Sequence, residues 1–192
     1  MQWSSAPGAA RSVLPLEVFW AVGLEGAVAF ESVRPRNPHV TSVLMGPSGF
    51  VAMRPRLDPL APSLILTAAD RGYIVDSHGH NDIFSIEVHA GGECLVGSPG
   101  CAPYGENPAR GYDEGTAAHS TLSVRGLEQL PLNGEWRWHG RVSPVIRRWI
   151  SEETHDYFHG VHEGFYDYGR TDLLHARKIL FVKARPGGPG YW

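Results

Sequence analysis

The sequence predicts an all-β fold, an antiparallel two-sheet β-sandwich with a short helical remnant at its N-terminal end. Glycine and proline are frequent, at 23 and 15 of the 192 residues, which suits turns between short strands. Short apolar runs of strand length recur along the chain, and helical periodicity is not convincing beyond about residue 30. Apolar residues make up 42% of the chain, which is enough for the core of one ordinary domain.

The first residues differ from the rest of the chain. Leu14, Val18, Phe19 and Val22 fall at spacings loosely compatible with one helical face, although Leu16 and Trp20 lie off that face. We therefore expect residues 1–30 to be the tail of an upstream helical region or a linker, and residues 31–192 to form the sandwich.

Strands are predicted for residues 50–54, 63–67, 94–96, 121–124 and 179–182. Residues 82–89 alternate, with Phe84, Ile86 and Val88 on one face, as in a half-buried strand. If that strand extends backwards, His78, His80 and Asp82 share this face.

Charge and composition exclude several classes of protein. A net charge of −3 argues against a nucleic-acid-binding protein. The longest apolar region, residues 13–30, is interrupted by Pro15, Glu17 and Glu25, so no membrane span is expected. The start of the chain lacks the basic-then-apolar order of a signal peptide, so either the protein is cytoplasmic or the true N-terminus lies upstream.

Cys94 and Cys101 could form a disulfide, but two small, partly buried thiols are favoured.

The densest group of histidines is the run His78-Gly79-His80. Two imidazoles close together on a strand can share a metal or catalytic site, and the alternative is a half-exposed polar pair at a strand entrance. A cupin metal site is disfavoured because Glu87 comes too late and faces the other way. Four later histidines are expected in exposed loops: His155, His159, His162 and His175. Trp136 and Trp138 could stack on sugars, but packing in the core is favoured. The basic pairs Arg147-Arg148 and Arg177-Lys178 could meet carboxylates, but a solvated rim is favoured.

An ordered series of motifs extends through most of the chain: GFVAMR, HGHNDIFSIEVHAGGECLVGSPG, PYG, TAAHSTLSV and HEGFYDYGRTDLLHARKILFVK. From about residue 45 to residue 192 this series resembles the C-terminal domain of the heparinase II/III-like polysaccharide lyases, including the oligoalginate lyases. These lyases cut uronic-acid-containing polysaccharides by β-elimination. The resemblance implies that His78 and Tyr104 are catalytic. Tyr112 is the alternative tyrosine, and a purely structural Tyr104 also remains open.

The resemblance also implies a structural zinc held by His80, His119 and an aspartate. Ser98 stands where that aspartate is expected, and Ser120 replaces a usual asparagine. A serine hydroxyl is a poor zinc ligand, so we expect zinc binding to be weak or absent. Asp82 is expected to hydrogen-bond to a ligand rather than bind the metal itself.

Family members carry a large helical toroid domain before the sandwich and generally act in the periplasm or cell envelope. Both ends of this chain look like those of a fragment or a reduced gene product, so the toroid is expected upstream or in trans. Two classes of function follow. In the first, the chain forms one wall of a lyase active site that acts on an acidic polysaccharide, and the chain alone is inactive. In the second, it is a non-catalytic module that binds acidic glycans or serves structurally.

Overall fold

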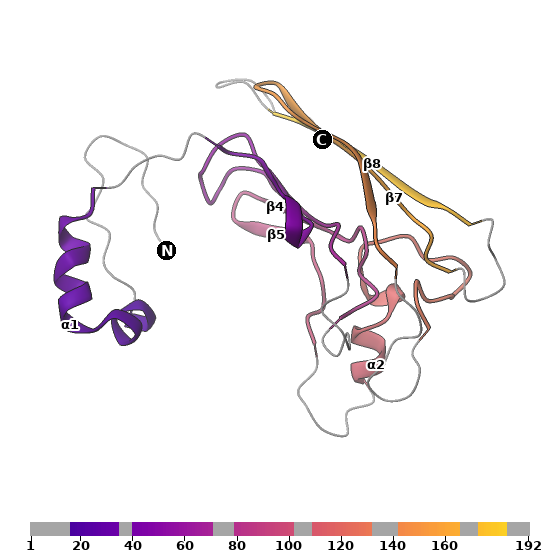
Figure 1. Ribbon diagram of the computed structural model, residues 1–192, viewed down its shortest axis with the longest axis horizontal. Helices are drawn as coiled ribbons and strands as arrows, with labels where there is room; N and C mark the ends of the chain where they lie inside the picture. The colour runs from indigo at the N-terminus through magenta and orange to yellow at the C-terminus, as the bar shows by residue number, and fades with distance from the viewer. Residues whose placement is uncertain are drawn as a thin grey trace.

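Two antiparallel sheets form the body of the protein in the computed structural model (Figure 1). The structure describes residues 16–34, 40–70, 79–101, 109–131, 142–165 and 173–183. The described helices are α1 (Leu16–Ser32) and α2 (Ala109–Asp113), with 3-10 turns η1 (Gly46–Ser48) and η2 (Thr116–Ala118).

The first sheet is a five-stranded meander in the order β1-β2-β3-β4-β5. Its strands are β1 (Val43–Met45), β2 (Phe50–Met53), β3 (Ser63–Thr67), β4 (Ile86–Ala90) and β5 (Glu93–Val96). β4 and β5 are joined by Gly91-Gly92, both with positive φ, which is the backbone that a two-residue hairpin loop requires. The strands predicted at 50–54, 63–67 and 94–96 are therefore confirmed.

The second sheet has the order β6-β7-β8 and is made of β6 (Val145–Ser151), β7 (His155–His162) and β8 (His175–Val182). The strand predicted at 179–182 is the end of β8. Histidines 155, 159, 162 and 175 lie in β7 and β8, so their expected placement in exposed loops is wrong. The sequence of β7 lacks a hydrophobic alternation, because its inward residues include Asp156, Gly160 and His162 beside Phe158.

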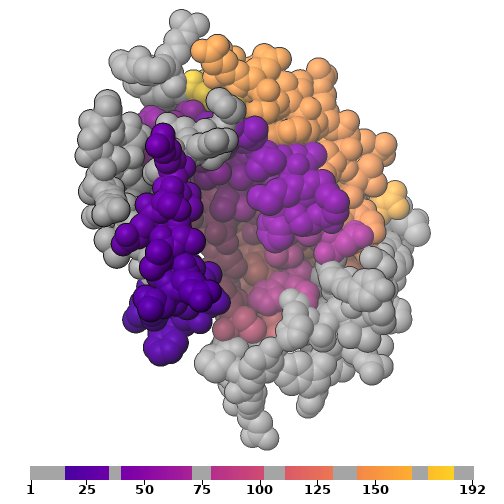
Figure 2. Space-filling model, turned by 60° about the vertical axis from the view of Figure 1, so that its left-hand side comes forward, coloured from indigo at the N-terminus to yellow at the C-terminus, as the bar shows by residue number. Residues whose placement is uncertain are grey.

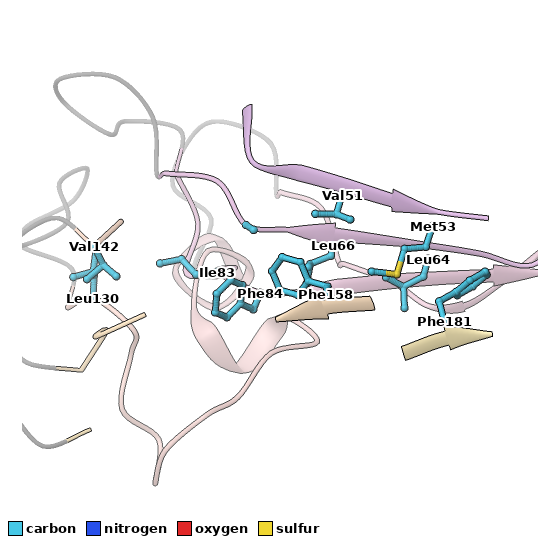
Figure 3. Packing of buried hydrophobic residues seen from close by; sticks show 11 residues of the cluster. Val51, Met53, Leu64, Leu66, Ile83, Phe84, Leu130, Val142, Phe158 and Phe181 are labelled. Atoms are coloured by element: carbon cyan, nitrogen blue, oxygen red, sulfur yellow. The ribbon is translucent and has the colours of Figure 1, made fainter. Parts of the chain in front are cut away.

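The core lies between the two sheets (Figure 3). Val51 and Met53 of β2 and Leu64 and Leu66 of β3 belong to one buried cluster with side chains from the second sheet, Phe158 and Phe181. Because one apolar cluster draws on both sheets, the predicted β-sandwich is confirmed.

A buried ion pair accompanies this core. Nζ of Lys183 lies 2.7 Å from Oδ1 of Asp156, and Ser42 Oγ donates to the other carboxylate oxygen at 2.6 Å. Ser42 precedes β1 and Asp156 lies in β7, so the carboxylate links the two sheets.

Two sequence predictions about strands are wrong. The strand expected from residue 82 begins only at Ile86, because Phe84 has a positive φ of 60° and its side chain is fully buried. The shared face of His80, Asp82 and the strand residues therefore does not exist. Residues 121–124 form no strand; Val124 makes only an isolated bridge to Leu127.

α1 stands apart from the sheets (Figures 1 and 2). Its helix is broken at Gly23, which has φ 67° and ψ −171°, and none of its residues is buried. Leu16, Trp20 and Leu24 are among its large exposed apolar side chains. Among the described residues, no helix has both the length and the apolar character needed to cross a membrane.

Candidate functional site

His80 and His119 lie side by side, with ring centroids 5.3 Å apart. His80 comes from the loop before β4, and His119 directly follows η2. His119 is buried, and its Nδ1 lies 3.2 Å from Oγ of Ser98, which follows β5. The structure thus brings together the three residues that the motif order singled out, His80, Ser98 and His119.

The other predicted site residues are placed as follows. His78 and Tyr104, the catalytic candidates, lie outside the described residues, as do Trp136 and Trp138. Tyr112, the alternative tyrosine, lies on α2 and is exposed. Oγ of Ser120 donates to the Gly97 carbonyl at 3.4 Å.

Two side-chain amides hold the loop that carries His80. Asn81 donates to the Leu130 carbonyl at 2.9 Å and accepts from the Leu130 N–H at 3.0 Å. Gln129 does the same for Ile83, accepting from its N–H at 3.0 Å and donating to its carbonyl at 2.9 Å. These amides replace the pairing of a β-ladder, so a non-strand segment is fixed beside residues 129–130.

The carboxylate of Glu128 holds the segment that carries His119. It accepts hydrogen bonds from the backbone N–H of Thr116 at 2.6 Å, the Thr116 hydroxyl at 2.7 Å and the side chain of Asn81 at 2.7 Å. Both histidine segments therefore share one anchor, which accounts for their close approach. Sequence reasoning missed Asn81, Glu128 and Gln129, because each acts through contacts with residues distant in the chain.

Arg177 connects the second sheet to this site. Its Nη1 donates to the carbonyls of Phe84 at 2.6 Å and Ser120 at 2.8 Å, and burial lowers the pKa of its guanidinium. The expectation of a solvated Arg177 is therefore wrong. By contrast, Arg147, Arg148 and Lys178 are exposed on their strands.

A second histidine pair lies in the sandwich next to Phe84. His162 Nδ1 accepts from the Gly164 N–H at 3.0 Å, and its Nε2 lies 2.7 Å from Nδ1 of His175. A neutral His162 must therefore carry its proton on Nε2 and donate it to His175. Burial, then the neighbouring His175 and Arg177, lower the pKa of His162 to about 3. Burial, then Arg177, lower the pKa of His175 to about 4. Both rings are thus neutral at pH 7.

The zinc that the resemblance implies does not fit the residues present at its three positions. Ser98 offers a neutral hydroxyl, and that hydroxyl is engaged with the imidazole of His119. Two imidazoles without an anionic ligand hold zinc poorly. Around His80, however, the structure places a thiol and a carboxylate that the sequence did not single out, those of Cys101 and Glu114. Neither Cys94 nor Cys101 is in a disulfide, and both are exposed rather than partly buried.

Comparisons with known proteins agree with this architecture. The family model described as "Heparinase II/III-like, C-terminal" matches residues 38–186. No curated protein sequence matches the chain. Among solved structures, heparan sulfate lyase HepC from Pedobacter heparinus is similar to this chain, with 20% identity and a TM-score of 0.64. A heparinase III gene product is similar to the same degree, with 19% identity and a TM-score of 0.64.

The two alignments cover 87% of this chain but only 24% of each solved chain, so this chain spans about a quarter of the length of those lyases. At such low identity the structural likeness concerns the fold. The family model, in contrast, matches 149 residues, from 38 to 186, which is most of the sequence. The chain therefore belongs to the heparinase II/III-like family of polysaccharide lyases and carries the C-terminal domain of that family.

Proposed function

We propose that this chain forms one wall of the active site of a lyase that cleaves a uronic-acid-containing polysaccharide by β-elimination. The observation that carries the proposal is the family match over residues 38–186. The names of the similar structures add heparan sulfate as the substrate of one relative. A uronate polymer of this acidic kind is the substrate class that we propose here.

The chemistry requires two proton transfers and one neutralised charge. A base removes the C5 proton beside the carboxylate, electrons move to expel the glycosidic oxygen at C4, and an acid protonates that oxygen. We assign the base and acid roles to His78 and Tyr104. Groups that neutralise the developing charge on the uronate carboxylate would come from the facing wall.

The facing wall is proposed to be a helical toroid domain, supplied upstream or in trans. Residues 1–30 would be the tail of that helical region and residues 31–192 the sandwich. The apolar side chains that α1 exposes, including Leu16 and Trp20, support this assignment, because a helix of that kind is usually covered by a partner element. Action in the periplasm or cell envelope is part of the same proposal.

A second candidate is a non-catalytic module that binds acidic glycan or serves structurally. The replacement of the expected aspartate by Ser98, hydrogen-bonded to His119, favours it. A lyase half-site and a binding module differ in one outcome, which is whether an added toroid domain restores turnover.

The test is an elimination assay on heparan sulfate and alginate that follows the ultraviolet absorbance of the unsaturated uronate product. The chain alone is expected to be inactive, since catalysis needs base, acid and substrate held together within about an ångström. The chain mixed with the toroid domain of a heparan sulfate lyase should turn over. His78→Ala should abolish that turnover, whereas His155→Ala, at the end of β7, should not. No turnover in any mixture would refute the lyase proposal, and turnover that survives His78→Ala would refute the role assigned to His78.

A further inference from the structure

Three chemically different donor atoms meet at His80. A ring nitrogen of His80, the sulfur of Cys101 and a carboxylate oxygen of Glu114 all lie within 4.8 Å of one another. The sulfur of Cys101 lies 4.0 Å from Oε1 of Glu114. His80 and Glu114 are half-buried, and Cys101 is exposed. The set can therefore be reached from solvent through Cys101.

The backbone holds two of these donors near each other. The N–H of Asn81 donates to the carbonyl of Glu114 at 2.9 Å, so the residue that follows His80 is bonded directly to the segment of Glu114. The Asn81 side chain is in turn bound to Glu128 and Leu130. A donor pair supported in this way loses little conformational freedom when a ligand binds.

We propose that His80, Cys101 and Glu114 form a binding site for a divalent transition metal of the zinc type. Zinc bonds of about 2.0–2.3 Å in a tetrahedron separate these unlike ligand atoms by about 3.3–3.6 Å. The present sulfur-to-oxygen distance of 4.0 Å needs to shorten by about half an ångström, which side-chain rotation supplies.

The donor types select the metal. Imidazole and thiolate favour zinc and cobalt over calcium and magnesium, which prefer oxygen ligands. On binding, the thiol of Cys101 releases its proton to solvent, and thiolate and carboxylate together balance the 2+ charge of the ion. Three protein ligands leave the fourth tetrahedral position for water or a further ligand.

This site differs from the one that the family resemblance implies. It shares only His80 with the set His80, His119 and Ser98, and it needs no carboxylate at position 98. Its anionic ligands come instead from Cys101 and Glu114. The inference does not depend on lyase activity, and binding alone tests it.

The experiment is a titration of the reduced, full 192-residue chain with Co²⁺, followed by absorbance. We expect a thiolate-to-cobalt charge-transfer band in the near ultraviolet, which Zn²⁺ added afterwards should abolish. Cys101→Ser should remove the band and weaken binding at least tenfold. Loss of a group that only hydrogen-bonds to a metal ligand already costs about tenfold in affinity, and Cys101 is proposed to be a ligand itself. Glu114→Gln should weaken binding by a similar factor but keep the band.

Cys94→Ser is the matched control, because Cys94 is also exposed and lies outside the donor set. It should leave both the band and the affinity unchanged. Circular dichroism of each variant checks that the fold is retained. The proposal is overturned if Co²⁺ does not bind, if it binds without a thiolate band, or if Cys101→Ser binds as tightly as the unmodified chain.

Discussion

The folding stability of this domain should fall as the pH is lowered from 7 to 5, because the His162–His175 pair resists protonation. In the unfolded chain both imidazoles take up protons near pH 6.5. In the folded protein their pKa values are about 3 and about 4, so both rings stay neutral at pH 5. The unfolded state therefore binds more protons throughout this range, and stability is lost as the pH falls from 6.5 towards 3.

The magnitude follows from linkage. Each pH unit below 6.5 costs about 1.4 kcal/mol for each histidine that stays neutral only in the folded state. Over the 1.5 units from pH 6.5 to pH 5, two histidines together cost about 4 kcal/mol, a large part of the 5–15 kcal/mol that stabilises a typical domain. The geometric cause is the enclosure of both rings around Phe84, with Arg177 nearby.

Urea unfolding at pH 7 and pH 5 measures this difference in the free energy of unfolding. His175→Asn keeps an acceptor for the Nε2 proton of His162 but removes one titrating group, so the difference should fall to about 2 kcal/mol. His89→Asn on β4 is the control and should leave the difference unchanged. If His175→Asn shows the same pH dependence as the unmodified chain, the buried pair is not its source and the reasoning fails.

Three further predictions concern single positions. Lys183→Met should lower the free energy of unfolding, measured in urea, by about 3–5 kcal/mol, because it leaves the Asp156 carboxylate buried without its cation. The double variant with Asp156→Asn should recover most of that stability, and no recovery would contradict the prediction. Gly160→Ala should cost about 1–3 kcal/mol in the same assay, since the new Cβ would lie 2.6 Å from a phenyl carbon; an unchanged midpoint would show that the core relaxes. Ser98→Asp added to Cys101→Ser should bind zinc more tightly in calorimetry than Cys101→Ser alone, because it adds a carboxylate beside two imidazoles. Equal zinc affinity of the two variants would disprove this.

Local pattern was sufficient for several strands of the first sheet. Residues 63–67 are a short apolar run and form β3. The Gly-Pro-Ser-Gly turn directly before Phe50 marks the start of β2. Strand propensity and turn chemistry therefore agree with the structure at both places. The same local pattern failed at Phe84. There, the alternation continues in the sequence, but burial of the whole ring against Phe158 and His162 places the backbone at positive φ.

The sequence by itself therefore determined the fold class and the family. The order of its motifs also assigned His80 and His119 to one site. Only the tertiary structure decided that β7 and β8 bury His162 and His175, and that Cys101 and Glu114 meet at His80. The physical reason is the range of the interactions involved. Turns and alternation are set by neighbours in the chain, whereas the Asn81 and Gln129 amide pairs join segments more than 40 residues apart, and no local pattern encodes their register.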